Sequence, residues 1–324
     1  MPERRMTDKK VVVTGGTGFL GKHLVKQLTY EGAKVFSFTS GQYNLTEQYC
    51  TETMLDDAFM AMDGIDILYH LAARVSGIGS IARNPAQFFY DNLMMGVNII
   101  DSCYDYAIDK IVVAGSVCAY PAYAPIPMIE KNLYNGYPEE SNSSYGIAKR
   151  TLHSMLKAYH EEYGLNGTYL LMANLYGPGD DFDPDTSHVI PALIKKIQEA
   201  IDNGDNSITV WGTGHASRDF LYVQDAVDAF VRAGLTSTGC QPINIGAGTE
   251  MPISGLVEEI KKVMEYSGET LYDTSKPDGQ KRRCLKIHRA EDRLEWRPII
   301  TLSSGLMETV DWFRQTVCQN QKKK

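Results

Sequence analysis

The sequence predicts an α/β protein, in which a doubly wound parallel sheet carries a smaller, mostly helical C-terminal lobe. Three observations lead to this class. Short apolar segments alternate with segments of helical periodicity up to about residue 180, a glycine-rich turn follows the first apolar segment, and the alternation loosens after residue 179. Strands separated by helices pair in parallel, because each crossover helix returns the chain to the same edge of the sheet.

The periodicity assigns each element in turn. In the first part of the chain we expect strands at 10–14, 35–38, 65–70, 111–114 and 168–172, and helices at 19–30, 85–106 and 143–163. In the second part we expect helices at 188–203, 224–235, 253–266 and 302–317, and strands at 207–211 and 242–245. The domains then follow as a cofactor domain at 1–180 with a return segment at about 215–250, a substrate lobe at 181–214 and 251–318, and a tail at 319–324.

Size and composition exclude several classes of protein. The 324 residues carry 32 basic and 40 acidic side chains, and a net charge of −8 disfavours nucleic acid as a partner. No apolar stretch reaches the roughly 20 residues that span a bilayer, and the polar N-terminus does not resemble a signal peptide. The six cysteines lack CxxC pairs, and the seven histidines lack metal-ligand spacing. We therefore expect a cytoplasmic protein without a metal site.

A glycine-rich turn at Gly15, Gly18 and Gly21 lies between the first strand and the first helix. The first glycine permits the tight turn, the second lets the backbone approach a pyrophosphate, and the third allows close packing of helix on strand. The helix N-terminus then faces the phosphates. Glycines alone often serve only in turns, but this order of strand, turn and helix predicts a dinucleotide site.

The segment after the second strand bears on the choice of cofactor. Binders of the unphosphorylated cofactor usually have an acid about 20 residues after the turn, yet this chain has Thr39-Ser40-Gly41-Gln42 and no carboxylate before Glu47. The missing acid removes repulsion against a 2′-phosphate and favours NADP(H). No arginine is present to bind that phosphate, so Ser40, or else Lys22 or His23, is the expected ligand.

A tyrosine and a lysine at Tyr145 and Lys149 share one face of a helix, one turn apart. The ammonium group is expected to lower the pKa of the phenol from about 10 and to hold the nicotinamide ribose. Ser116 ends a strand at the sheet edge where α/β enzymes bind ligands, and its hydroxyl can bond a substrate carbonyl. YxxxK alone is commonly a solvated helix face; together with Ser116 and the glycine turn it indicates catalysis.

These features resemble the extended short-chain dehydrogenase/reductase family, from Val11 to about Phe313. Several segments are similar to the members that make GDP-L-fucose by epimerisation and reduction. They are 115–121 (GSVCAYP), 174–178 (NLYGP), 187–193 (SHVIPAL), 210–214 (VWGTG), 218–221 (RDFL) and 275–279 (SKPDG). SHVIPAL and SKPDG discriminate best, because the first two segments recur across sugar-nucleotide epimerases.

The resemblance implies a set of binding residues. Those implied for the cofactor are Gly15, Thr17, Gly18, Phe19, Leu20, Gly21, Ser40, Leu71, Ala72, Ala73, Tyr145, Lys149, Asn174, Leu175 and His188. Those implied for the GDP diphosphate and base are Lys196, Trp211, Arg218 and Arg283. Trp211 could instead belong to the core, and Lys196 and Arg283 could be ordinary surface charges.

Two further residues would perform the epimerisation of a 4-keto sugar, whose C3 and C5 protons are acidic. Cys118 follows Ser116 by two residues, and on an extended segment it would project to the same side as a base. A nearby cation would have to lower its thiol pKa from about 8.5 towards neutrality. His188, which aligns with the family's catalytic histidine, would return protons from the other face, although it could equally cap a helix.

The resulting hypothesis is a bifunctional 3,5-epimerase and NADPH-dependent 4-reductase acting on a GDP-4-keto-6-deoxy-hexose. The loop at 72–77 (AARVSG) departs from the lysine and the Gly-Gly pair that are common in this group, so a related sugar or a single activity stays open. A pure epimerase that retains NAD is the nearest alternative, and a non-catalytic scaffold is a more distant one. The helices at 85–106 and 143–163 resemble those that form dimers in the family, which implies a homodimer.

Overall fold

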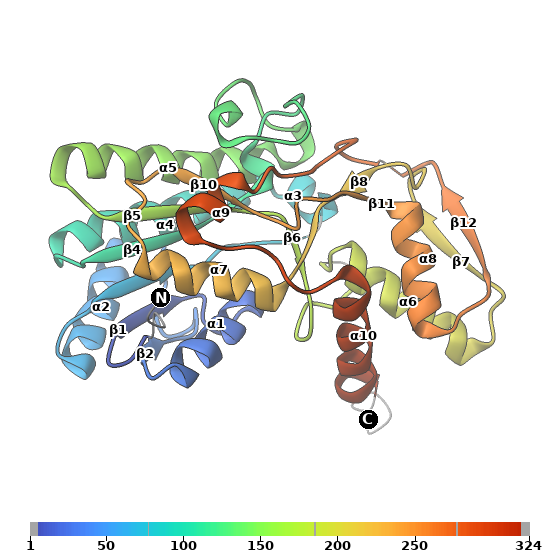
Figure 1. Ribbon diagram of the computed structural model, residues 1–324, viewed down its shortest axis with the longest axis horizontal. Coiled ribbons are helices and arrows are strands. Elements are labelled where there is room, and N and C mark those ends of the chain that lie inside the picture. Colours follow the sequence, from blue (N-terminus) through green and yellow to red (C-terminus); the bar gives the residue numbers. More distant parts are fainter. Residues whose placement is uncertain (1–5, 77, 185, 277, 319–324) are drawn as a thin grey trace.

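The computed structural model describes residues 6–318 except 77, 185 and 277, so the tail expected at 319–324 lies outside the described residues (Figure 1). A central sheet of parallel strands has the order β10-β5-β4-β3-β1-β2. Its strands are β1 (Lys10–Thr14), β2 (Lys34–Ser37), β3 (Ile67–His70), β4 (Lys110–Ser116), β5 (Gly167–Met172) and β10 (Pro242–Ile245). The strand order reverses between β1 and β3, and ligands bind at such a point in doubly wound sheets.

Helices cover both faces of this sheet, as the alternating pattern predicts (Figure 1). One layer holds α2 (Gln48–Met62), α4 (Pro85–Asp105) and α5 (Ser143–Tyr163). The other holds α1 (Phe19–Tyr30), α7 (Val223–Leu235) and α9 (His288–Leu294). Because both faces are covered, β1, β3 and β5 are buried almost throughout. The doubly wound α/β class is confirmed.

A second part of the chain packs beside the sheet. It contains α6 (Val189–Asn203), α8 (Ile253–Met264) and α10 (Leu302–Phe313), with a parallel pair formed by β7 (Ser207–Trp211) and β12 (Glu269–Asp273). Their apolar faces form a hydrophobic cluster separate from the larger one around the sheet. Side chains at 285–296, within the range expected for the second lobe, pack instead into the larger cluster, because α9 lies against β10 and α7.

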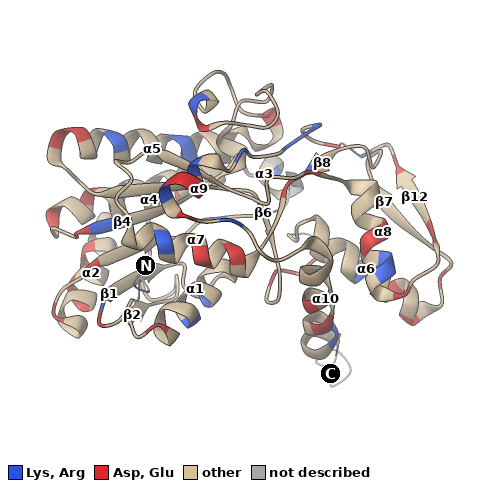
Figure 2. Cartoon of the chain, in the orientation of Figure 1, with Lys and Arg blue, Asp and Glu red and all other residues tan. Residues whose placement is uncertain are grey.

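Short strands link the two parts. β6 (Asn174–Tyr176) pairs with β9 (Phe220–Tyr222), and β8 (Ser217–Arg218) pairs with β11 (Met251–Pro252). Smaller helical elements complete the chain: α3 (Ile78–Arg83), the 3₁₀ turns η1 (Val117–Ala119), η2 (Glu130–Asn132) and η3 (Glu140–Asn142), and the π-helical turn η4 (Arg314–Cys318). Acidic and basic residues are mixed along the helices of both parts (Figure 2). Every described helix is too short or too polar to cross a membrane.

Candidate active site

The glycine turn closes tightly over the end of β1. Gly15 has φ +69°, and a Cβ on it would lie 2.7 Å from the Ala72 nitrogen. A Cβ on Gly21 would lie 2.0 Å from the Gly15 carbonyl oxygen. Gly18 differs, because its nearest neighbour would be the Gly15 oxygen at 3.3 Å and the residue is exposed. Gly15 and Gly21 therefore shape the turn, whereas Gly18 leaves open space at the N-terminus of α1.

The loop after β3 lies against this turn. The Ala72 N–H donates to Thr14 Oγ1 at 3.2 Å, and the Leu71 N–H donates to the Thr14 carbonyl at 3.2 Å. Thr14 Oγ1 also bonds His70 Nδ1 at 3.0 Å. Leu71, Ala72 and the following Ala73 thus leave the sheet where the strand order reverses, next to Gly15 of the turn that leads through Thr17 to the first residues of α1, Phe19 and Leu20. The predicted cofactor segments meet there.

The end of β2 provides a hydroxyl group that the sequence analysis missed. A Cβ on Gly16 would lie 2.1 Å from Ser37 Oγ, so Ser37 is adjacent to the glycine turn. The predicted ligand, Ser40, lies three residues further on in an exposed turn. Ser37 could have been predicted from its position as the last residue of β2, because the contact with the cofactor ribose is expected at the end of that strand. His23 bonds the Pro178 carbonyl at 2.7 Å, so its ring already has a structural partner.

Ser116, Cys118 and Tyr145 lie together at the carboxyl end of β4. Ser116 ends the strand, and its Oγ accepts the Cys118 N–H at 3.2 Å. The expectation of an extended backbone at Cys118 was wrong, because the chain turns there into η1. α5 packs closely on this turn, since a Cβ on Gly146 would lie 2.3 Å from the Cys118 carbonyl oxygen. Cys118 packs beside the buried ring of Tyr145.

The ionisation of Tyr145 and Lys149 is dominated by burial. Burial raises the pKa of Tyr145, and the Cys118 thiol adds to this, while a hydrogen bond with Ser116 opposes it. Burial lowers the pKa of Lys149 to about 8. Its Nζ donates to the Ala114 carbonyl at 3.0 Å and lies 6.0 Å from the Tyr145 ring centroid. The expected lowering of the tyrosine pKa by the lysine was therefore wrong in direction, because desolvation of the phenol outweighs the distant cation.

His188 occupies the N-cap position of α6, yet its side chain makes no capping hydrogen bond to the described residues. The residue is exposed, and desolvation by the surrounding protein lowers its pKa while Asp181 opposes the shift. On the neighbouring β6, the Asn174 side chain donates to the Asp219 carbonyl at 2.9 Å, and Leu175 is half-buried. The His188 ring is thus available for another role than capping.

Two buried arginines lie next to Cys118. Arg218, in β8, donates to the carbonyls of Ser217, Gln280 and Asp278. Arg283 donates to Gln280 Oε1 at 2.8 Å and to Cys118 Sγ at 3.5 Å. Burial and the neighbouring Arg283 lower the pKa of Arg218 to about 10. Among the described residues neither guanidinium forms an ion pair with a carboxylate, so this pair is suited to an anionic ligand.

Trp211 ends β7 and is 62% exposed, so the alternative of a core residue is wrong. The ammonium groups of Lys196 and Lys276 lie 5.6 and 5.3 Å from its ring centroid. An exposed indole beside two cations can stack on a base and attract its phosphates. Lys276 was not predicted, although it lies in the SKPDG segment. Asp278 joins this segment to the turn after β7, because its carboxylate accepts from Thr213 N and Oγ1 at 2.7 Å each.

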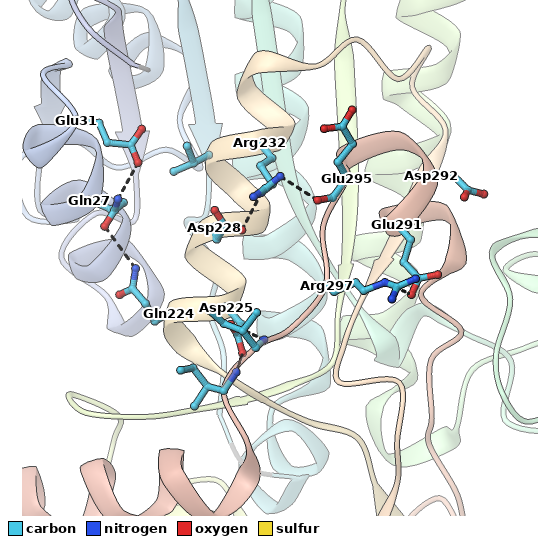
Figure 3. Close-up of a pocket in the computed structure, with 13 residues that line it drawn as sticks. Gln27, Glu31, Gln224, Asp225, Asp228, Arg232, Glu291, Asp292, Glu295 and Arg297 are labelled. Atoms are coloured by element: carbon cyan, nitrogen blue, oxygen red, sulfur yellow. Dashed lines mark hydrogen bonds and ion pairs between the residues drawn. The ribbon is translucent and has the colours of Figure 1, made fainter. Parts of the chain in front are cut away.

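A separate pocket lies between α1, α7 and the segment around α9 (Figure 3). Its charged groups are largely engaged with one another: Asp228 pairs with Arg232, and Glu291 pairs with Arg297. Asp225 accepts from the backbone N–H groups of Ile299 and Ile300. The lining contains none of the predicted site residues, so this pocket is not the candidate active site.

The family follows from comparison with known proteins. Residues 11–246 match the model of the NAD dependent epimerase/dehydratase family. This match covers more than half of the chain, and the protein belongs to that family of enzymes.

Three similar proteins have names that indicate a class of substrate. GDP-L-fucose synthase 1 of Arabidopsis thaliana is 35% identical over 316 residues, covering 97% of this chain and 96% of the relative. A GDP-L-fucose synthetase from Naegleria fowleri bound to NADP has a TM-score of 0.83 and 28% identity, covering 96% of this chain and 95% of that one. A GDP-6-OMe-4-keto-L-xylo-heptose reductase from C. jejuni has a TM-score of 0.86 and 25% identity, and the match covers 96% of this chain and 99% of that one. The protein is thus similar to enzymes of GDP-sugars over its whole length.

The two glycines of the turn should respond differently to alanine. In Gly21→Ala the methyl group meets backbone atoms, and we expect the free energy of unfolding to fall by about 1–3 kcal/mol. In Gly18→Ala the fold should be kept within about 1 kcal/mol, while the Kd for NADPH rises at least about tenfold, because the methyl group fills the space for the pyrophosphate. Urea unfolding and NADPH fluorescence titration would measure both. Equal effects of the two substitutions on stability would contradict this assignment.

Lys149→Met should stabilise the cofactor-free protein at pH 7 by about 1–3 kcal/mol, because it removes a buried charge. A lysine whose pKa is lowered to about 8 makes native stability rise with pH between 8 and its ordinary 10.5, since the unfolded chain binds more protons there. The advantage of the variant should therefore shrink by pH 10 in urea unfolding. Lys157→Met, at an exposed lysine of the same helix, is the control. A less stable Lys149→Met protein at pH 7 would refute the argument.

Proposed function

We propose that this protein is a bifunctional 3,5-epimerase and NADPH-dependent 4-reductase that converts a GDP-4-keto-6-deoxy-hexose into GDP-L-fucose or a close analogue. The observation that carries the proposal is the cluster of Ser116, Cys118 and Tyr145 beside two buried arginines. A hydroxyl pair suits a ketone oxygen, a thiol suits an acidified C–H bond, and unpaired guanidinium groups suit a diphosphate. Similarity to GDP-L-fucose synthases over nearly the whole chain supports the same substrate class.

The cofactor fits the residues present. Gly18 leaves space at the N-terminus of α1, and Gly15 and Gly21 give the turn its shape. Ser37 and Ser40, with no acid beside them at the end of β2, are compatible with a 2′-phosphate. When bound there, NADPH supplies the hydride that reduces the C4 ketone. We assign NADP(H) as the cofactor, in line with the NADP-bound structure of the Naegleria fowleri relative.

The chain's own residues would carry the proton transfers. The Cys118 thiolate takes the proton from C3 and then from C5, and the electron pair moves to the oxygen at C4. Hydrogen bonds from Ser116 and Tyr145 stabilise that enolate oxygen. His188 gives a proton to the opposite face of each carbon, which inverts it. After reduction, Tyr145 protonates the alkoxide at C4, and Lys149 holds the nicotinamide ribose beside it.

The substrate's nucleotide would extend from Cys118 towards β7. Arg218 and Arg283 are assigned to the diphosphate side, and Trp211 with Lys196 to the base. Lys276 adds a cation on the indole that the sequence analysis did not include. Hydrogen bonds from Arg218 to the carbonyls of the 278–280 segment connect the residues assigned to the diphosphate with those assigned to the base.

A 4-reductase without epimerase activity is the second candidate. The loop at 72–77 departs from the pattern of the fucose-forming group, and the C. jejuni relative is described as a heptose reductase. An epimerase that retains NAD is the third, and stoichiometric NAD in the purified protein would favour it.

We also propose a cytoplasmic location, since the described cysteines are all free thiols.

Product analysis in D₂O distinguishes these candidates. With GDP-4-keto-6-deoxy-mannose and NADPH, we expect deuterium at C3 and C5, inversion at both carbons and stoichiometric oxidation of NADPH. Cys118→Ser should still oxidise NADPH but give a product that retains configuration and carries no deuterium at either carbon. Tyr145→Phe should slow reduction by about 10²–10⁴-fold and slow exchange at C3 and C5 much less, because Ser116 still donates to the enolate oxygen. Retention at both carbons by the wild-type enzyme would reject the bifunctional proposal in favour of a reductase.

We also propose a homodimer formed by the outer faces of α4 and α5. Tyr90, Leu93, Val97 and Tyr104 recur along α4 at the spacing of one helix face, and Tyr90 and Tyr104 are 54% and 45% exposed. We expect Tyr90→Glu to convert a dimer at micromolar concentration into a monomer, because it places a charge in the apolar interface. Sedimentation velocity would measure this, with Tyr30→Glu on α1 as the control. A monomeric wild-type protein would contradict the proposal.

A further inference from the structure

Arg283 has a contact that the diphosphate assignment does not explain. Its Nη1 donates to Cys118 Sγ at 3.5 Å, across 165 positions of the chain. The arginine is 5% exposed, whereas the cysteine is half-buried. A buried guanidinium thus approaches the sulfur from the protein side and leaves the other side of Cys118 accessible.

The guanidinium group is held in place before any ligand arrives. Gln280 Oε1 accepts from Arg283 Nε at 2.8 Å, and Gln280 Nε2 donates to the Ala122 carbonyl at 3.0 Å. The backbone N–H of Arg283 donates to the Ser217 carbonyl at 3.1 Å. These contacts fix Arg283 between β8 and the segment after η1, so its direction towards the sulfur is set by the fold.

The sulfur is held from its own side as well. Ser116 Oγ accepts the Cys118 N–H, and Gly146 lets α5 close on the carbonyl of the same residue. The described titratable or charged groups that interact with Cys118 include Arg283, Arg218 from β8 and Tyr145 from α5. Both guanidinium groups are cationic, and Arg283 makes no ion pair with a carboxylate among the described residues. Its charge is therefore not neutralised by a carboxylate in the part of the chain that the structure describes.

We infer that Arg283 is a positioning residue that keeps Cys118 as a thiolate directed at the sugar. This inference rests on the proposed function, because it supplies the cation that a thiol needs in order to act as a base near neutral pH. This role adds to the diphosphate assignment of Arg283. Arg218, which donates to three backbone carbonyls of β8 and the 278–280 segment, is assigned to the diphosphate alone.

Alkylation of Cys118 by iodoacetamide tests this directly. The thiolate forms the S–C bond and iodide leaves, so the rate follows the thiolate fraction. The rate is measured from pH 5.5 to 9.5 on the full-length, ligand-free protein, by mass spectrometry of the peptide that contains Cys118. We expect Arg283→Gln to lower the rate at pH 7 by about 3–10-fold and to leave the plateau at high pH unchanged.

Two further variants make the result specific. Arg282→Gln is the matched control, because the neighbouring Arg282 pairs with Glu250 at the surface. It should follow the wild-type pH profile. Arg283→Lys keeps the charge and should stay within about threefold of the wild type at pH 7. Thermal melts of all variants report folding.

An Arg283→Gln profile that coincides with the wild type would overturn the inference. If that variant does not fold, the Arg283→Lys variant is the test. A folded Arg283→Lys protein whose Cys118 is alkylated only at the high pH of an unperturbed thiol would equally overturn the inference. Because alkylation needs neither substrate nor cofactor, its outcome is independent of whether the proposed reaction occurs. In turnover, Arg283→Gln should lose deuterium exchange at C3 and C5 about tenfold, with the KM for NADPH unchanged.

Discussion

One buried carboxyl group, that of Asp219, joins the short strands between the two parts of the chain to the sheet and to the segment that carries Arg283. It lies between β8 and β9 and accepts backbone N–H groups from Ala247, Gly248 and Leu285 at 2.7, 3.2 and 3.1 Å. Burial raises its pKa to about 6, and these three hydrogen bonds oppose the shift. One side chain thereby fixes the turn after β10 and the segment that carries Arg283. Asp219 follows Arg218 directly, and Leu285 lies two residues after Arg283, so the same hydrogen bonds help to hold both arginines near Cys118.

Much of the fold could be predicted because most elements carry their own periodicity. The helix expected at 143–163 and the strand at 207–211 have the predicted bounds. The helix at 48–62 was missed, since its buried face includes Thr51 and Ala58 as well as large apolar side chains. The pairing of β7 with β12 joins segments about sixty residues apart, and no local pattern encodes such a contact.

The residues of the candidate site also differ in whether a local sequence pattern predicts them. Ser116, Tyr145 and Lys149 were found because strand ends and helix spacing are local properties. The 3₁₀ turn at Cys118 was not, because α5 packs on that turn through Gly146, far along the chain. The contact between Arg283 and Cys118 could not be predicted by any spacing rule. Lys276 is a third case: it lies in the SKPDG segment at 275–279, yet only the folded structure brings it to Trp211.

The contacts of the buried cations in the candidate site have one feature in common: none of the acceptors described is a carboxylate. Lys149 and Arg218 are buried, and burial lowers their pKa values to about 8 and 10, so each positive charge disfavours the ligand-free fold. Carboxylate partners would relieve that cost but would also neutralise the field that an anionic ligand needs. Backbone carbonyls accept from Lys149 and Arg218, and the Gln280 side chain accepts from Arg283, so the three cations are held without their charge being cancelled. Phosphates arriving at such groups find donors already oriented, so binding requires little reorganisation and should itself stabilise the fold.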